Sequence, residues 1–547
     1  MAFDASVIRC LAIELNQKLK GGKIDKIHQP QKDELYLVFR TFKESFRLRI
    51  SVTPACPRLN LTSDKYENPP APPMFCMLLR KHLGGGRLIQ VEQIGFERIL
   101  IFHIESYDEL GDLSVKKLIV EIMGKHSNII LVNKEDKIID SIKRIDISLS
   151  SVRQVLPGLT YHLPPNDRKN PLISPLEEDL SDKREPEKEL TKIYSGISPQ
   201  LAGEILRTGF DNVIEKIKNN EFSPCIILDS KDNAVDFSAI AVTQYGQEFK
   251  IVPDESISGV VDTFYRQKAH SALLKRLSAE LLRLVSNNIE RCEKKLSIFE
   301  RQIQDSQKKD TYKIYGELIT ANLYKIKYGD KEVVADNYYD GTEVTIPLDE
   351  NLSPAKNAQR YYTKYTKAKT AEEQAIIQKK KTEKELKYLE SVADEIARAD
   401  SPSDIAEIKE ELRETGYISA DTSKRKKKDL PLSPIEFEID GYTVLVGRNN
   451  RQNDYLTLKM ARSTDIWLHT KDIPGSHVII RKKQDEEIPD AVIEKSAILA
   501  ARHSKAKNSS KVAVDYTTVK NVKKPSGAKP GMVIYDHYYT IYVNPTE

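Results

Sequence analysis

The sequence is poor in cysteine and tryptophan and has no long apolar run, and each shortage excludes a class of protein. Five cysteines are scattered through 547 residues without Cys-x-x-Cys spacing, which indicates neither a disulfide framework nor a zinc knuckle. No stretch is long and apolar enough to cross a bilayer. Residues 1–20 lack the uninterrupted apolar core of a signal peptide. We therefore expect a protein of the reducing cytoplasm.

The motifs of several enzyme classes are also missing. The chain has no Walker loop, no Gly-x-Ser-x-Gly nucleophile elbow and no His-Glu-x-x-His zinc motif. The glycines Gly84 to Gly86, before Arg87, are typical of a helix end rather than of a phosphate loop. The sequence therefore favours a binding protein over an enzyme, and we expect no cofactor and no metal.

Two proline-free, highly charged stretches carry a narrow apolar seam. In the first, apolar residues recur at three- and four-residue steps: Leu274, Leu277, Leu281, Val285, Cys292, Leu296, Phe299 and Ile303. In the second, the spacing is shared by Ala375, Thr382, Leu386, Leu389, Ala393 and Ile396. The pattern predicts an antiparallel coiled coil over 261–422, whose first arm covers 261–328. An ordinary helical bundle is the alternative, but narrow seams and charged flanks favour the coiled coil.

A short segment between the arms has the pattern of a β-hairpin. Residues 329–352 contain two strand-like runs around the turn pair Asp340 and Gly341, and Pro354 follows. We expect a small hairpin cap, after which the second arm begins.

The net charge of +4 conceals an uneven distribution. Residues 1–170 hold 26 Lys+Arg against 20 Asp+Glu, and residues 424–547 hold 22 against 15, whereas the middle holds 37 against 46. Two basic ends around an acidic middle predict a polyanionic partner that both ends contact. Chance segregation in a large charged protein is the alternative.

Residues 1–172 form the first predicted domain, in which strands and helices mix. A helix is expected at Ser6 to Leu19, and a second follows a proline-rich segment at residues 69–73. On this second helix we expect the side chains of Met74, Met77, Leu78 and Leu83 to face the core. The basic residues Arg80 and Lys81 would then lie near its edge and become candidates for RNA contact.

Two polar interruptions of apolar strands are the candidate binding loops of this domain. Glu97 and Arg98 lie side by side between apolar runs, and Gly95 permits a bend just before them. Lys125 and His126 lie in a loop of hydrogen-bond donors of the kind that contacts phosphates or base edges. A surface ion pair and a turn histidine are the alternative interpretations.

Residues 173–260 begin with a polar linker and continue into a pair of short helices. Ser198 and Pro199 have the pattern of a helix cap and first turn, and the segment resembles a helix-hairpin-helix module. The turn amides of such a module can receive a phosphate. One short copy is equally compatible with a plain helical hairpin.

Residues 423–547 form the last predicted domain, and its basic and aromatic residues predict an RNA surface. The candidates are Arg448, Arg451, Trp467, His469, Arg502 and Lys505. Cations contact phosphates, and aromatic faces stack on exposed bases. The basic run Lys424 to Lys428 is either a solvated linker or a nucleic-acid contact. A metal site at His469 and His477 is disfavoured because no acidic or thiol ligand is close in sequence.

Several of these blocks together resemble the NFACT family over essentially the whole chain. They are PPMFCMLLRKHL, GFER, EIMGKHSNIILVN and DSIKRI in the first domain, and GRNNRQNDYLTLKMA, DIWLH and PGSHV in the last. The resemblance implies an α+β multidomain protein. Its expected parts are a formamidopyrimidine-glycosylase-like N-terminal domain, a helix-hairpin-helix, a long antiparallel coiled coil and an α/β C-terminal RNA-binding domain.

The glycosylase-like fold does not imply glycosylase activity here. Such enzymes use an N-terminal proline followed by glutamate, whereas this chain has Ala2 and Phe3. Ala2 offers no secondary amine for a Schiff base, and Phe3 is neither acid nor base. A DNA-repair enzyme is therefore a disfavoured rival.

The resemblance also implies a binding site and a function. An acidic residue followed by arginine holds transfer RNA in the family, and Glu97 and Arg98 match it, with glutamate in place of the more familiar aspartate. Lys125 and His126 lie in the matching loop. The implied function is bacterial ribosome-associated quality control, in which alanine tRNA is recruited to a stalled 50S subunit with peptidyl-tRNA, and alanine is added without messenger RNA. A small Hsp15-like RNA-binding protein is the implied additional partner.

An older name for the bacterial members suggests a different function. They were called fibronectin-binding proteins, so a surface adhesin is the main rival. The missing export signal and anchoring segment disfavour it.

Overall fold

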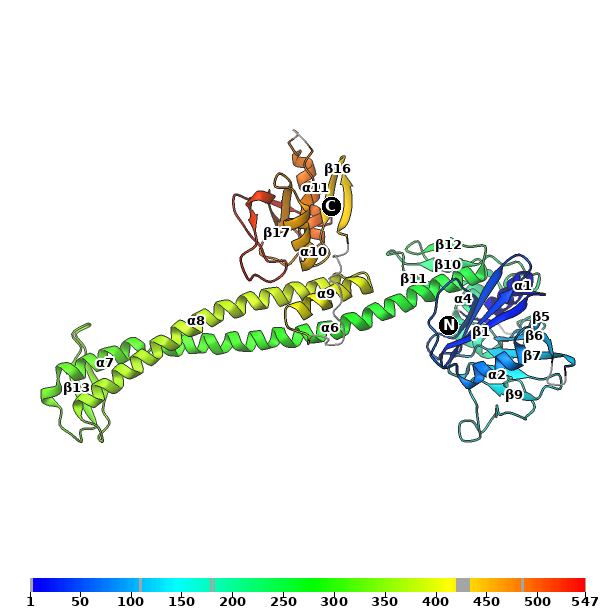
Figure 1. Ribbon diagram of the computed structural model, residues 1–547, viewed down its shortest axis with the longest axis horizontal. Helices are drawn as coiled ribbons and strands as arrows, with labels where there is room; N and C mark the ends of the chain where they lie inside the picture. Colours follow the sequence, from blue (N-terminus) through cyan, green and yellow to red (C-terminus); the bar gives the residue numbers. More distant parts are fainter. Residues whose placement is uncertain are drawn as a thin grey trace. The chain divides into compact units, whose positions relative to one another are not determined.

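The computed structural model describes residues 3–107, 111–177, 180, 183–419, 433–483 and 487–546. It divides into two compact units, Met1–Ser271 and Ala272–Glu547. The long helix α6, Ile257–Ser306, begins in the first unit and continues in the second. Figure 1 gives the labels of the elements.

The first unit is built on a nine-stranded antiparallel sheet with the order β4-β3-β2-β1-β5-β6-β7-β8-β9. The strands are β1 (Lys23–Gln31), β2 (Glu34–Arg40), β3 (Ser45–Ser51), β4 (Arg58–Leu61), β5 (Arg87–Gln93), β6 (Ile99–Tyr107), β7 (Leu113–Glu121), β8 (Asn128–Val132) and β9 (Ile138–Ser141). β1 and β5 pair only through Lys23 and Arg87, and α2 (Met74–Leu83) packs against β1 and β6.

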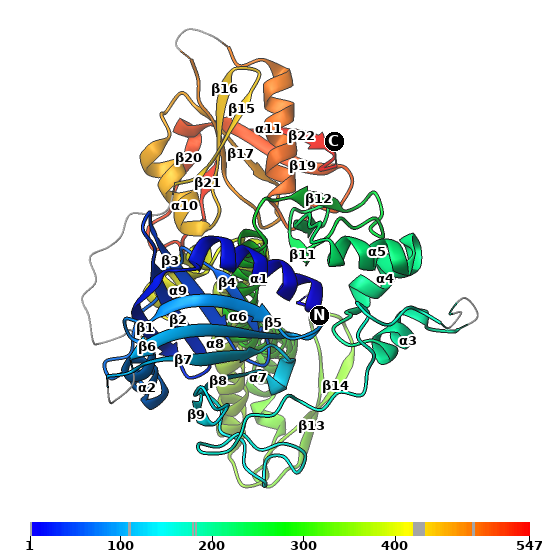
Figure 2. The ribbon, with the colours of Figure 1, turned by 90° about the vertical axis from the view of Figure 1, so that its right-hand side faces the viewer.

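Helices α1 (Ala5–Leu19) and α2 bury one face each in the core of this sheet (Figure 2). On α2 the prediction was partly wrong. Leu83 is buried as expected and Leu78 partly so, but Met74 is 82% exposed and Met77 is 50% exposed. The helix has two apolar stripes, and the one that carries Phe75, Cys76, Leu79 and Leu83 is buried instead.

A helical segment and a small sheet complete the first unit. They comprise α3 (Pro186–Ile193), α4 (Pro199–Thr208), α5 (Phe210–Lys218), β10 (Cys225–Leu228), β11 (Ala234–Ser238) and β12 (Lys250–Pro253). The predicted cap is present, because Ser198 Oγ accepts a hydrogen bond from the Leu201 N–H at 3.0 Å. Gly209, with φ +97°, alone separates α4 from α5. The helix-hairpin-helix assignment stays a prediction, as does the likeness of the nine-stranded sheet to glycosylases.

In the second unit, α8 (Pro354–Arg398) packs antiparallel to α6 (Figure 1). Two ion pairs define the direction, because Lys379 Nζ of α8 lies 2.9 Å from Glu300 Oε1 of α6, and Glu372 of α8 pairs with Lys309, which follows α6 in the chain. The predicted seam is largely buried, including Leu281, Val285, Cys292, Ala375, Thr382, Leu389 and Ile396. The stretch 261–328 is not one continuous helix, since α6 ends at Ser306 and α7 (Lys309–Ala321) follows.

The hairpin between the arms is present. β13 (Glu332–Asp336) and β14 (Glu343–Pro347) pair antiparallel, and Gly341 in the turn has φ +74°. Ile346 and Val333 pack with residues of α7 and α8, which fixes the hairpin on the helices.

The C-terminal part of the second unit follows α9 (Pro402–Glu414) and is a six-stranded sheet with the order β15-β16-β18-β17-β19-β22. Its elements are β15 (Ile435–Ile439), β16 (Tyr442–Val446), α10 (Asn450–Tyr455), β17 (Ile466–Thr470), β18 (Val478–Ile480), α11 (Asp490–Arg502), β19 (Val512–Thr518), β20 (Val522–Lys523), β21 (Ile534–Tyr535) and β22 (Tyr539–Val543). α11 packs on one face of the sheet, and Trp467 is buried in a separate cluster.

Among the described residues, no helix combines the length and the apolar character that a membrane span requires.

Candidate RNA-binding site

Glu97 and Arg98 lie in the tight turn between β5 and β6. Gly95 has a left-handed φ of +53°, and the Glu97 N–H donates to the Ile94 carbonyl oxygen at 3.0 Å. Gln93 Nε2 donates to the carbonyl oxygens of Glu97 and Ala5, at 2.9 Å each, and so fixes the turn against α1. Glu97 Oε1 accepts from Asn166 Nδ2 at 2.5 Å instead of pairing with Arg98.

The Arg98 guanidinium is partly buried and has no hydrogen-bonded partner in the described part of the chain. Burial lowers the pKa of Arg98, whereas the nearby charges of Asp4 and Glu97 raise it. An arginine stays cationic under such a shift and offers up to five N–H donors. Open donors on a partly desolvated cation favour a charge-assisted contact with a phosphate or carboxylate.

The buried residue Asp4, which the sequence analysis did not single out, joins two helix N-termini near this turn. Its Oδ1 accepts from the backbone N–H groups of Ser6 at 3.0 Å and Val7 at 3.2 Å, and so caps α1. Its Oδ2 accepts from Ser198 Oγ, the cap of α4, at 2.7 Å. Burial raises the pKa of Asp4. An aspartate before an amphipathic run is a cap signal, but its bond to a residue 194 positions away leaves no local pattern.

Phe3, next to Asp4, has a packing role. Its side chain is fully buried, and its ring lies 6.2 Å from that of Phe237 in an edge-to-face arrangement. Ala2, which stands where the glycosylases have their N-terminal proline, lies outside the described residues.

The loop of Lys125 and His126 lies at the same end of the sheet as the Arg98 turn. The Ile122 N–H donates to the Arg98 carbonyl oxygen at 2.9 Å, and Ile99 pairs with Glu121 in the β6–β7 ladder. Lys125 and His126 are exposed in the short 3-10 turn Gly124–His126. The structure thus brings the two predicted loops together, whereas Arg80 and Lys81 lie on α2.

The interpretation of Trp467 as a stacking surface is wrong. Its side chain is fully buried, so neither face of the indole is open to a base. His469 stacks on it at 5.7 Å, and burial lowers the pKa of His469 to about 4. Basic and aromatic residues in this part of the sequence predicted a surface role for Trp467, but the sheet pairs it with apolar neighbours such as Ile479 on β18.

Arg448 and Arg451 face α9 rather than an open surface. Their guanidinium groups lie 3.9 Å from Asp404 Oδ2 and 3.8 Å from Glu414 Oε1, respectively. The same loop donates from Asn449 Nδ2 to Glu407 Oε2 at 2.7 Å. Both arginines thus contact acidic residues within the chain, and their predicted RNA contact stays a prediction.

Two buried glutamates lie where this loop meets α8 and α9. Glu411 Oε1 accepts from Tyr388 Oη at 2.8 Å and from Asn450 Nδ2 at 3.3 Å. Among the residues that the structure describes, Oε2 of Glu411 and Oε2 of Glu395 have no hydrogen-bond partner. Burial raises the pKa of Glu411 to about 7, and burial together with the Glu411 charge raises that of Glu395. Burial therefore favours the protonated form of both carboxyls.

Arg502 and Lys505, at the C-terminal end of α11, remain exposed. Arg502 Nε donates to the Pro545 carbonyl oxygen at 2.7 Å. Their RNA contact stays a prediction. The basic run Lys424 to Lys428 lies outside the described residues. Nowhere in the described ranges do three His, Cys, Asp or Glu side chains gather as a metal site would require.

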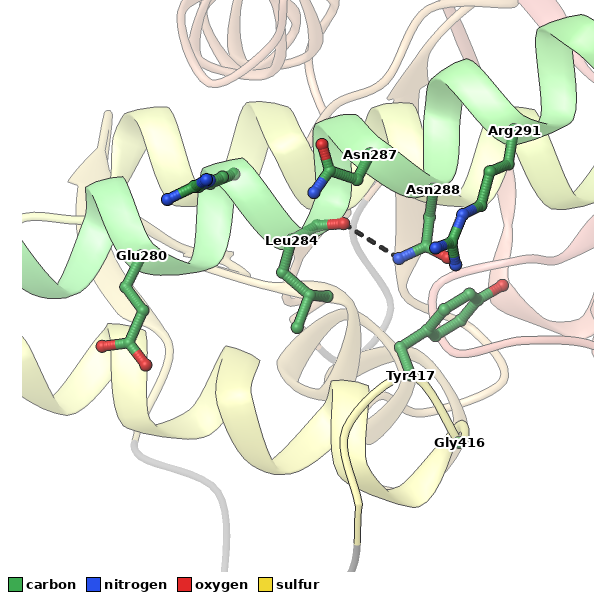
Figure 3. Close-up of a pocket in the computed structure, with 8 residues that line it drawn as sticks. Glu280, Leu284, Asn287, Asn288, Arg291, Gly416 and Tyr417 are labelled. Carbon is green, nitrogen blue, oxygen red and sulfur yellow. Dashed lines mark hydrogen bonds between the residues drawn. The ribbon is translucent and has the colours of Figure 1, made fainter.

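A polar groove of about 510 Å³ lies between α6 and the segment that follows α9 (Figure 3). α6 contributes Arg283 and Arg291, with Glu280 at one end, and Tyr417 lies opposite. Asn288 Nδ2 donates to the Leu284 carbonyl oxygen at 2.9 Å within α6. Two guanidinium groups against one carboxylate give the groove an excess of positive charge.

The comparisons with known proteins agree on one family. Residues 4–430 match the model of the NFACT N-terminal and middle domains, and residues 435–536 match that of the NFACT protein RNA binding domain. The Rqc2 homolog RqcH of Bacillus subtilis is 42% identical over 100% of this chain and 98% of that protein. The RqcH of Streptococcus suis is 38% identical over 100% of this chain and 99% of that protein.

A solved structure titled as the N-terminal part of a fibronectin/fibrinogen-binding protein from Streptococcus suis is 33% identical. It covers 48% of this chain and 99% of its own, with a TM-score of 0.43, and carries no argument about function. The full-length relatives and the two matched models decide the assignment. The chain belongs to the NFACT family and is a homologue of the RqcH factors of ribosome quality control.

Proposed function

We propose that the chain acts on 50S subunits that still carry peptidyl-tRNA after a stalled ribosome has split. It recruits an alanine-charged tRNA, and ribosomal RNA performs the peptidyl transfer, so that alanine is added to the nascent chain without messenger RNA. The tail marks the product for degradation. The chain itself does no covalent chemistry in this scheme, and it works in the cytoplasm on the ribosome with a small Hsp15-like RNA-binding protein.

One observation carries the tRNA assignment. Arg98 is a partly buried guanidinium for which the described part of the chain supplies no hydrogen-bonded partner, and it is held in a turn that Gln93 fixes against α1. Lys125 and His126 are exposed at the same end of the sheet. These donors suit the phosphates of a folded RNA, and Glu97 supplies an acceptor for a base or ribose edge.

Replacing Arg98 tests whether tRNA binding and 50S subunit binding depend on different residues of the chain. Arg98→Ala should weaken tRNA retention about tenfold to a hundredfold, because a charge-assisted contact is worth about 1.5–3 kcal/mol, and should abolish tailing. Arg98→Lys keeps the positive charge but not the planar set of guanidinium donors, so it should recover only part of the affinity for tRNA. Co-sedimentation with 50S subunits should stay near the wild-type level. Equal loss of tRNA and subunit binding would contradict the assignment, and Lys134→Ala, in the exposed β8–β9 turn, is the matched control.

The adhesin and the DNA-repair enzyme make different predictions. An adhesin would fractionate with the cell surface, whereas the proposed factor co-fractionates with 50S subunits. A repair enzyme would form a Schiff base that borohydride traps, and we expect none from a chain with Ala2 and a buried Phe3.

A further inference from the structure

The outer face of strands β1, β2 and β3 carries a group of basic and aromatic side chains remote in sequence from the Arg98 turn. The β-ladder places His28, Tyr36 and Arg49 in one row across the three strands. Lys26 and Arg47 flank Val38 in the next row. Leu35, Leu37 and Phe39 of β2 point to the opposite face and belong to the core, so the basic and aromatic row faces away from it.

Tyr66, from the segment that follows β4, covers this row. Its ring stacks on that of Tyr36, with centroids 4.0 Å apart and an interplanar angle of 29°. The His28 ring lies 5.5 Å from it, and the Arg47 guanidinium lies 5.2 Å from its centroid. Tyr36 is 2% exposed beneath it, whereas Tyr66 and His28 keep part of their surface open. The outermost ring of the stack is therefore available to a further planar group.

Three of the cations around the rings lack carboxylate partners in the described part of the chain. Among the described residues, neither Lys26, Arg47 nor Arg80 forms an ion pair, and the two arginines donate to backbone carbonyls. Arg80 Nε donates to the Ile27 carbonyl oxygen at 2.8 Å. Arg49 differs, because Glu34 Oε1 lies 2.5 Å from it. The pKa of His28 is lowered by burial and then by the charges of Arg80, Lys26 and Arg47, which reports a net positive field at this face.

A hollow continues the surface on the side of Arg47. It has a volume of about 580 Å³ and is also lined by Lys18, Ser45, Ser63, Arg266 and Asp262, of which the last two form an ion pair. On the other side, next to Arg80, Met77 is 50% exposed, and its sulfur lies 3.8 Å from an Arg80 guanidinium nitrogen. Arg47 thus joins the rings to a hollow that has room for a sugar and a phosphate, and the Met77 thioether lies on the opposite side of the rings, next to Arg80.

We propose that this face, defined by His28, Arg47, Tyr66 and Arg80, is a second RNA-binding site and takes unpaired nucleotides, one base stacking on Tyr66 while the arginines contact the flanking phosphates. The ligand class follows from the chemistry. A stacked tyrosine offers a π-face to any base, and unpaired arginines favour a polyanion. A duplex keeps its bases stacked inside and cannot use the ring. The inference deepens the proposed function, on which it rests for the presence of RNA.

The test measures binding of the full-length chain to three probes: a ten-nucleotide single-stranded oligouridylate, a blunt RNA duplex of equal length, and tRNA. Tyr66→Ala should weaken oligouridylate binding about tenfold, in line with base–aromatic stacking energies, and Tyr66→Phe should restore it. Arg47→Ala with Arg80→Ala should weaken all three probes and reduce the slope of log K against log salt by about 1.4 for the single strand. The control is Lys134→Ala with Lys137→Ala, which removes two exposed cations from the β8–β9 turn.

Photo-crosslinking of the wild-type chain to the oligouridylate is the second measurement, because it needs no variant to fold. Uridine adducts should map to peptides that contain Tyr66 or His28. The inference is overturned if Tyr66→Ala and the arginine pair behave like the control and no adduct maps to this face, while Arg98→Ala still loses tRNA. If the variants keep the wild-type RNA affinity but lose a crosslink to a ribosomal protein, the face binds a protein partner. That result would also overturn the inference. Failure of the proposed function looks different, since the wild-type chain would then retain neither tRNA nor 50S subunits.

Discussion

Raising the pH should loosen the packing of α9 against the C-terminal part of the chain, and Glu411→Gln should reduce this effect. Glu411 is fully buried, and its pKa is raised from 4.5 to about 7, first by burial. Asp454 raises it further, whereas bonds from Tyr388 and Asn450 and the charge of Arg451 lower it. Because the folded state binds the proton more tightly than the unfolded state, stability is complete below pH 4.5 and is lost as the pH rises to 7.

The expected loss is about 3 kcal/mol, since each pH unit between the two pKa values is worth about 1.4 kcal/mol. Glu395, whose pKa is also raised, adds to the loss in the same direction. In hydrogen exchange, about 3 kcal/mol corresponds to roughly a hundredfold change in the protection of amides that open with this contact. We expect that change in α9 and in residues 449–455 of the full-length chain between pH 4.5 and pH 8, after correction for intrinsic exchange rates.

Glu411→Gln keeps the acceptor for Tyr388 and Asn450 but carries no titrating proton. In this variant the protection of the α9 amides should equal that of the wild type at pH 4.5 and exceed it at pH 8. Glu410→Gln is the matched control, because Glu410 is a neighbour on α9 whose side chain is 44% exposed and pairs with Arg413. Equal protection in wild type and Glu411→Gln at both pH values would refute the burial argument.

Three further perturbations test other parts of the structure. Gly196→Ala should destabilise the first unit by about 2–4 kcal/mol in thermal unfolding and reduce tRNA retention. The reason is that φ of Gly196 is +70° and an added Cβ would lie 2.2 Å from the Phe96 carbonyl oxygen. Unchanged stability would contradict the close packing at the Arg98 turn. Trp467→Phe should cost under about 3 kcal/mol and leave RNA affinity unchanged, because the indole is buried and its N–H has no partner in the described ranges. A selective loss of RNA affinity would restore Trp467 as a binding residue. Replacing residues 301–378 by a short Gly/Ser linker keeps the Glu300–Lys379 pair and should reduce pelleting with 50S subunits at unchanged tRNA affinity, whereas wild-type pelleting would argue against a role of the arm on the ribosome.

The long-range periodicity of the arms could be predicted because each apolar residue repeats a local rule many times. Leu281, Val285, Leu389 and Ile396 are all buried as their spacing predicts. The Asp340-Gly341 turn and the Ser198 cap were predictable for the same reason, since each depends on residues adjacent in sequence.

The wrong predictions concern residues whose burial or contacts depend on elements that pack against them from elsewhere in the sequence. Met74 and Met77 have helical spacing, but a stripe with phenylalanine competes for the same core. Trp467 is buried by strands that its own segment does not reveal. The acidic neighbours of Arg448 and Arg451 on α9 could not be predicted either, because Asp404 and Glu414 are remote from them in sequence. For the candidate site, Arg98 and its loop were identified by resemblance, whereas Asp4 became visible only through its bond to Ser198.

Because α6 and α8 pair in an antiparallel register, the length of the arm is set by the number of residues in the two helices. Each residue removed from α6 must be matched by one removed from α8, or Leu389 and Ile396 lose their partners across the seam. Removing seven residues from both helices would bring the β13–β14 hairpin about 10 Å closer to the base of the arm and leave its facing unchanged. Homologues that differ in arm length should therefore differ by paired insertions in multiples of about seven, and a series of such variants would measure how far along the arm its target lies.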